Sequence, residues 1–172
     1  MQCRVVECRH QCEALAASVE ACFATHGRSH LLVSNHGVPV KYVERGDPYQ
    51  EQVDRTSALL AAALGLGPQD YSRTFQSRFG PTEWLAPSTD GRLLELAKDG
   101  VRAVTVVTPS FAVDCLETLE EIAVESRAKF LAAGGTSFQL VPALNDSAGH
   151  VAVLAALLAR HGVNTTGRAG RA

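Results

Sequence analysis

The chain has 172 residues, of which 46% are hydrophobic and 20% are charged, and these values favour one compact domain with a sizeable core. A formal net charge of −2 and a sequence pI near 6.3 provide no basic surface for a phosphate backbone, so nucleic acid is not an expected partner. No run approaches the roughly 18 to 20 apolar residues of a membrane span, and the first residues lack the apolar core of a signal peptide. We therefore expect a cytoplasmic protein with at most peripheral membrane contact.

Helix and strand patterns alternate along the whole chain. Helices are predicted where apolar residues recur three and four positions apart, and strands where short apolar runs end at Gly, Pro or Asn. In chain order the expected elements are a helix near 11–24, a strand near 31–34, a helix near 49–65, a strand near 71–76, a helix near 90–99, a strand within 101–109, a helix near 115–133, a strand near 138–144 and a helix near 147–161.

The run VRAVTVVTP at 101–109 is the clearest strand. It is apolar on both faces, as central parallel strands are, and Pro109 stops it. Because strands alternate with helices, the predicted fold class is α/β, with a parallel four-stranded sheet flanked by helices. Open sheets of this kind bind ligands beyond the carboxyl ends of their strands, where His36 and the segment after Pro109 fall.

The α/β domain is expected to occupy residues 14–162. Residues 1–13 form an N-terminal lead, and residues 163–172 lack apolar periodicity and are predicted to be a flexible tail.

Four of the five cysteines lie in the first 22 residues. Cys3, Cys8 and Cys12 follow a CX4CX3C spacing, for which only Cys22 or His10 offers a fourth ligand. We expect thiols here rather than a disulfide framework, and a metal or cluster site is the less favoured alternative.

Several side chains could carry chemistry. His36 could accept a proton near neutral pH or bind a divalent metal, although a histidine that caps or satisfies a loop is commoner. Trp84 could provide a flat apolar wall together with Phe75, Phe79 and Tyr49, although core packing is the usual fate of such residues. Arg78 could pair with a carboxylate of a ligand.

Glu117, Glu121 and Glu125 recur every four residues and so form one row along the helix predicted near 115–133. The row is expected to face water or a cleft, and a solvated face is the commonest use of such a pattern. Cys115, just before the row, is interpreted as a small buried apolar residue. The residues expected on the opposite, buried side are Leu116, Leu119, Ile122, Ala123 and Phe130.

Four motifs occur in a fixed order: SNHGVP (34–39), GDPYQEQ (46–52), FQSRFGPTEWL (75–85) and DCLETLEEI (114–122). Together they resemble the carboxy-terminal half of the ferrochelatases, the enzymes that insert ferrous iron into protoporphyrin. The resemblance runs from about Ala14 to about His161 and implies a chelatase-like half-domain. The third and fourth motifs are long enough to make accidental agreement improbable.

The resemblance implies roles for particular residues. His36 stands at the position of the family's active-site histidine and Glu117 at that of the carboxylate facing it across the porphyrin, both being metal or proton ligands. Glu121 and Glu125 match the acidic row that forms a metal or proton path. Ser34 and Trp84 match positions near the porphyrin pocket, and Arg78 is the candidate partner for a porphyrin propionate on the chemistry of its side chain.

Porphyrin metallation would give the carboxylate row a purpose. Two pyrrole protons must leave while a hydrated cation sheds water, so proton acceptors and oxygen ligands are needed together. A π-bulge in the helix would bring successive carboxylates into closer line. By the resemblance, protoporphyrin IX and Fe²⁺ are the substrates.

The chain also departs from the family pattern. Ferrochelatases have two similar α/β halves with porphyrin between them, and the first half is not in this sequence. The resemblance then implies a homodimer, a separate first-half chain, or an inactive truncated fragment; a non-catalytic porphyrin- or metal-binding half-domain is the alternative from another class. Family members with a [2Fe-2S] cluster draw cysteines from the carboxy-terminal region, where this chain has none, so no cofactor is expected.

Overall fold

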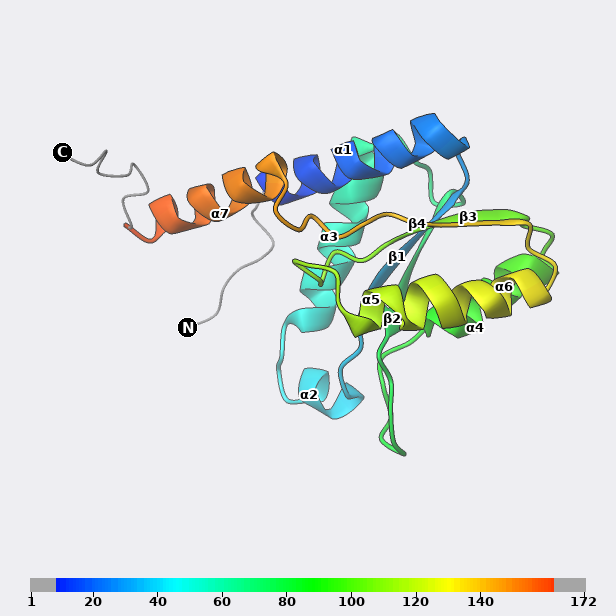
Figure 1. Cartoon of the computed structure of the whole chain (residues 1–172). Coiled ribbons are helices and arrows are strands. Elements are labelled where there is room, and N and C mark those ends of the chain that lie inside the picture. Colours follow the sequence, from blue (N-terminus) through cyan, green and yellow to red (C-terminus); the bar gives the residue numbers. More distant parts are fainter. Residues whose placement is uncertain (1–8, 163–172) are drawn as a thin grey trace.

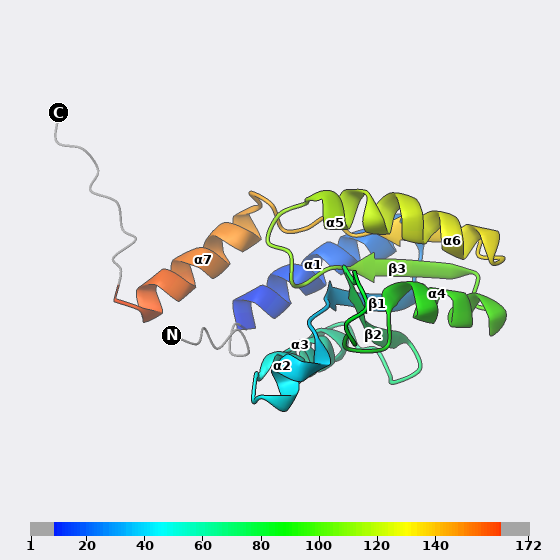
Figure 2. The same cartoon turned by 90° about the horizontal axis from the view of Figure 1, so that it is seen from below.

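Four parallel strands form the centre of the computed structural model, which describes residues 9–162. The strands are β1 (His30–His36), β2 (Tyr71–Gln76), β3 (Ala103–Val107) and β4 (Ser137–Leu140). Their order in the sheet is β2-β1-β3-β4, and Figure 2 shows β1 between β3 and β2. The predicted α/β class with a parallel four-stranded sheet is confirmed.

Helices cover both faces of this sheet (Figure 1). The larger helices fall where the apolar periodicity predicted them, whereas the short α2 was not predicted. The helices are α1 (Arg9–His26), α2 (Val40–Glu44), α3 (Tyr49–Ala63), α4 (Thr89–Lys98), α5 (Leu116–Leu119), the π-helix η2 (Glu121–Ser126), α6 (Arg127–Ala132) and α7 (Ala148–Arg160).

Alternate residues of β1 enter two separate apolar cores. Leu31 and Val33 pack on one face in a cluster with residues of α1 and α3. Leu32 packs on the other face in a cluster with residues of α4, η2 and α6. Both faces of β1 are therefore buried, which explains the apolar run of Leu31, Leu32 and Val33 at its centre.

The connections leave a crevice at the carboxyl ends of β1 and β3. From β1 the chain moves outward to β2 and then returns past β1 to β3, so the loops after β1 and β3 depart in opposite directions. Open α/β sheets bind ligands at such a switch point. His36 lies at the end of β1, and the loop of Pro109 and Ser110 follows β3.

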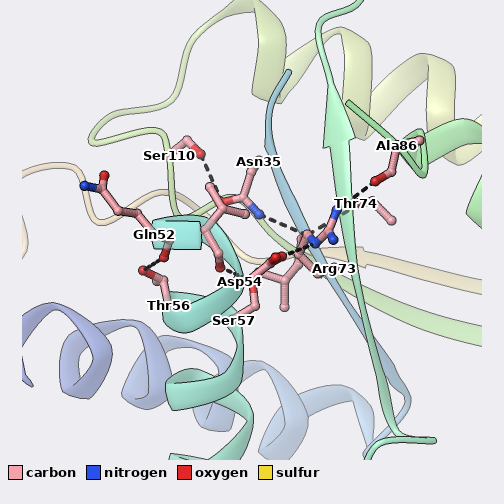
Figure 3. A network of polar contacts seen from close by, with 11 residues as sticks. Asn35, Gln52, Asp54, Thr56, Ser57, Arg73, Thr74, Ala86 and Ser110 are labelled. Carbon is pink, nitrogen blue, oxygen red and sulfur yellow. Dashed lines mark hydrogen bonds and ion pairs between the residues drawn. The ribbon is translucent and has the colours of Figure 1, made fainter. Parts of the chain in front are cut away.

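The edge strand β2 is tied to its surroundings by Arg73. The guanidinium lies 2.7 Å from the Asp54 carboxylate of α3 and donates to the Ala86 carbonyl at 2.8 Å (Figure 3). The loop of residues 77–87 begins at the end of β2 and projects beyond the sheet at the bottom of Figure 1.

The continuous helix predicted near 115–133 is interrupted by the π-helix η2. The Glu125 amide bonds to the Glu120 carbonyl at 3.0 Å, a spacing of five residues. Leu116 and Leu119 are 78% and 53% exposed, so the expectation that they face the core is wrong. They fall outside the buried side because that side follows positions four apart, namely Thr118, Ile122, Ser126 and Phe130.

Other differences are small. The last strand ends at Leu140 rather than near 144. The predicted flexible tail, Cys3 and Cys8 lie outside the described residues. Within residues 9–162, no helix has both the length and the apolarity needed to cross a bilayer.

Phe130 tests the core beneath η2. Its side chain is 0% exposed and its ring centroid lies 6.2 Å from that of Phe138. Phe130→Ala should lower the free energy of unfolding by about 3–5 kcal/mol, because it removes buried contacts and leaves a cavity. Val151→Ala, at an exposed apolar site, is the control and should change it by about 0.5 kcal/mol or less in urea denaturation. Equal losses of unfolding free energy in both variants would contradict the buried position of Phe130.

His30 makes stability depend on pH. Burial, and secondly the positive charge of Arg92, lower its pKa below the ordinary 6.5, and its Nε2 lies 2.9 Å from the Ser72 hydroxyl. Below pH 6.5 the unfolded state binds more protons than the folded state at this residue, so the free energy of unfolding should fall as the pH falls. Urea midpoints between about pH 5.5 and 7.5 should fall less steeply with acidification in His30→Gln than in the unmodified chain. Identical pH slopes would exclude this role for His30.

Candidate active site

His36 places its imidazole at the carboxyl end of β1. Its Nδ1 lies 2.7 Å from the Gly37 carbonyl oxygen, which can only accept, so Nδ1 is the donor in this contact and Nε2 is the nitrogen left for another partner. Residue 37 has to be glycine because a Cβ there would lie 2.7 Å from the Gln76 carbonyl oxygen. The SNHGVP segment thus leaves Nε2 available as a base or a metal ligand.

Gln76 joins the strand ends to the carboxylate helix. It lies opposite His36 in the β1–β2 register and is 2% exposed. Its Oε1 accepts from the Ser34 hydroxyl at 2.8 Å, and its Nε2 donates to the Glu117 carbonyl at 2.6 Å and to the Glu121 carboxylate at 3.4 Å. This buried amide holds the start of the helix against the end of the sheet that carries His36.

Glu117 is an exposed carboxylate that stays ionised. A hydrogen bond from the Cys115 thiol is the main cause that lowers the pKa of Glu117, and its own backbone amide acts in the same direction. The charge of His36 lowers it further, so the two side chains are close enough to interact electrostatically. The structure therefore brings His36 and Glu117 to the same edge of the sheet.

Glu121 is fixed at the turn after β2. Its Oε1 accepts from the Ser77 amide at 2.6 Å and its Oε2 from the Ser77 hydroxyl at 3.0 Å. Ser77 has a φ of 60°, in the left-handed region, and this conformation turns the chain so that both donors reach the carboxylate. Glu121 is thus a carboxylate held between β2 and η2.

Glu125 lies at the outer end of the row and is exposed. Its carboxylate is 3.8 Å from the Lys129 ammonium, which also contacts Asp90 at 2.6 Å. The Asp90 carboxylate raises the pKa of Lys129 and keeps this cation in place. In the part of the chain that the structure describes, no group of three or more His, Cys, Asp or Glu side chains converges on one metal position.

Trp84 and Arg78 border a pocket of about 340 Å³ beside this row. The Trp84 indole donates to the Phe79 carbonyl at 3.1 Å, and the two rings lie 5.4 Å apart. Glu121 lines the same pocket, so a flat ligand held there would lie beside the carboxylates.

Ser34 and Cys115 lie close behind the site. Ser34 is 0% exposed and its hydroxyl is bonded to Gln76 and, at 2.7 Å, to Thr89, so in this structure it supports the site from behind. Cys115 is half-buried, so the expectation of a buried residue is met only in part. Phe75 is fully buried in the core.

Sequence reasoning missed the roles of Gln76, Ser77 and Ser110. The available signal was position: each of them ends a predicted strand or follows it directly, at the edge where ligands bind. Their partners lie more than 30 positions away in the chain.

Known proteins are similar to this chain over most of its length. A sequence model of the family described as Ferrochelatase matches residues 6–162. The ferrochelatase of Aeromonas hydrophila is 48% identical over 149 residues, covering 86% of this chain and 46% of the relative. That of Sodalis glossinidius is 52% identical over 142 residues, covering 82% and 42%. The chain thus spans less than half the length of these curated relatives.

The thiol beside Glu117 gives a direct test of the site. Cys115→Ala should raise the pKa of the Glu117 carboxyl toward its ordinary value of 4.5, because the hydrogen bond that favours the charged form is lost. Cys115→Ser, which retains a donor, should keep the pKa low. Carbon-13 NMR titration of the Glu117 carboxyl measures both. An unchanged pKa in the alanine variant would rule out this hydrogen bond.

Proposed function

The chain belongs to the ferrochelatase family, and from that premise we propose that it supplies the metal-inserting wall of a ferrochelatase, which converts protoporphyrin IX and Fe²⁺ into protohaem. The observation that carries the proposal is the pairing of an imidazole with an ionised carboxylate at one edge of the sheet. His36 uses Nδ1 to bond the Gly37 carbonyl, which leaves Nε2 for a substrate, and Glu117 remains charged at neutral pH.

Metal insertion exchanges two protons for one dication. Each pyrrole N–H gives up its proton while the nitrogen lone pairs bind Fe²⁺, and two protons leave with no change in the oxidation state of iron. In the proposed reaction Nε2 of His36 accepts a pyrrole proton, and the Glu117 carboxylate binds the arriving cation or takes the second proton. Because no redox step is involved, the proposal includes no resident cofactor.

The carboxylate row would serve the substrates on their way to this pair. Glu125 at the surface and Glu121 nearer to Glu117 offer successive oxygen ligands for Fe²⁺, or acceptors for departing protons.

The macrocycle would lie against the loop after β2. Trp84 provides an aromatic face, and Arg78, which is exposed and lines the same pocket, would pair with a propionate. Ser34 has no direct part in this arrangement.

A second α/β half would complete the site. Leu116 and Phe79 are both 78% exposed, and Val113 and Leu119 are also exposed, so apolar side chains surround the proposed site. Exposed apolar groups of this kind favour a contacting surface. We propose that this surface belongs to the family's other half, provided on the same polypeptide, on a separate chain or by a second copy. We place the assembly in the cytoplasm.

Zinc insertion into deuteroporphyrin, followed by fluorescence, tests the proposal. The chain is assayed alone and after mixing with the amino-terminal half of the Aeromonas hydrophila relative. At least one condition should exceed the uncatalysed rate, and His36→Ala and Glu117→Gln should each lower that rate by about 10²-fold or more. Glu20→Gln, on the exposed side of α1, is the matched control and should leave it unchanged.

A background rate in both conditions would reject catalysis by this chain. Porphyrin absorbance shifts without turnover would favour a non-catalytic porphyrin-binding half-domain. Equal rates in the unmodified chain and both site variants would reject the assigned roles of His36 and Glu117.

A further inference from the structure

Along one side of β1, the backbone N–H and C=O of His36 are both bonded by side chains. Pairing between β1 and β3 ends at Val33 and Val107, whereas pairing with β2 continues to His36. The amide N–H of His36 donates to the Ser110 hydroxyl at 3.2 Å, and its carbonyl accepts from the Tyr49 hydroxyl at 2.7 Å. These two hydroxyls take the place of a strand at the residue that carries the imidazole.

The direction of each hydrogen bond is determined by its partners. The Ser110 hydroxyl donates to Oδ1 of Asn35 at 3.0 Å, as Figure 3 shows, so its oxygen is left to accept from the His36 amide. The Tyr49 hydroxyl donates its hydrogen to the His36 carbonyl. The two hydroxyl oxygens lie 3.3 Å apart, so they contact the backbone of His36 from adjacent positions.

Both hydroxyls are anchored by their own segments. Tyr49 begins α3, and its amide donates to the Asp47 carboxylate at 2.9 Å. Burial raises the pKa of the Tyr49 phenol, so it remains a donor at neutral pH. Ser110 follows Pro109 in the loop after β3, which leaves its hydroxyl facing the end of β1.

We propose that Tyr49 and Ser110 are positioning residues for His36. They hold its backbone N–H and C=O so that the imidazole points toward the reacting centre. The role in turnover rests on the proposed function. Neither residue is assigned a contact with substrate; both act through the orientation of His36. Partners of this kind typically contribute 10- to 100-fold to activity.

Variants that remove single hydroxyls test the proposal without disturbing packing. Tyr49→Phe removes the hydroxyl and keeps the ring. Ser110→Ala removes the hydroxyl, whereas Ser110→Thr keeps it. Tyr49→Phe and Ser110→Ala should lower kcat for zinc insertion by about 10- to 100-fold with KM within about twofold. Ser110→Thr should restore most of the rate. Tyr71→Phe, at the amino end of β2, is the matched control and should leave kcat unchanged.

A second measurement needs no turnover. The His36 ring lies 6.0 Å from the Phe111 ring, so the ring current makes its NMR resonances sensitive to its orientation. The imidazole resonances should shift in Tyr49→Phe and Ser110→Ala but not in Tyr71→Phe. Unmoved resonances, or an unchanged kcat where His36→Ala is inactive, would overturn the proposal. If the unmodified chain shows no turnover, the proposed ferrochelatase function is rejected. The imidazole resonances then decide by themselves whether Tyr49 and Ser110 position His36.

Discussion

The buried amide of Gln76 is the contact on which the arrangement of the site depends. It receives a hydrogen bond from Ser34 on β1 and donates to the backbone of Glu117, so one side chain links two strands to the carboxylate helix. A buried amide must satisfy both its oxygen and its nitrogen, and here the helix backbone provides the acceptor for the nitrogen. The imidazole and the carboxylate are therefore brought together by a residue that has no assigned contact with substrate.

The π-helix gives the three glutamates different surroundings. Glu117 is ionised beside His36, Glu121 is held by Ser77, and Glu125 lies at the surface near Lys129. An uninterrupted helix would carry them as an equivalent row. The change in helix type lets the row follow the border between the buried and exposed sides, where carboxylates can be anchored and still reach solvent.

Hydroxyl groups complete the other side of the site. Where β3 turns away from β1, Tyr49 and Ser110 bond the peptide group of His36. The GDPYQEQ segment is thus connected to the SNHGVP segment through a backbone contact. The apolar residues around the opening, Leu116 and Phe79 among them, remain exposed and suit contact with another half.

The sequence by itself determined the α/β class, the position of nearly every strand and helix, and the identity of His36 and Glu117 as candidates. It could do so because apolar periodicity and short motifs are local properties of the chain. Only the tertiary structure decided that Ser34 is buried, that Leu116 faces outward, and that Gln76, Tyr49 and Ser110 support the site. These features depend on hydrogen bonds between distant segments and on the π-helix, and neither leaves a periodic signal in the sequence.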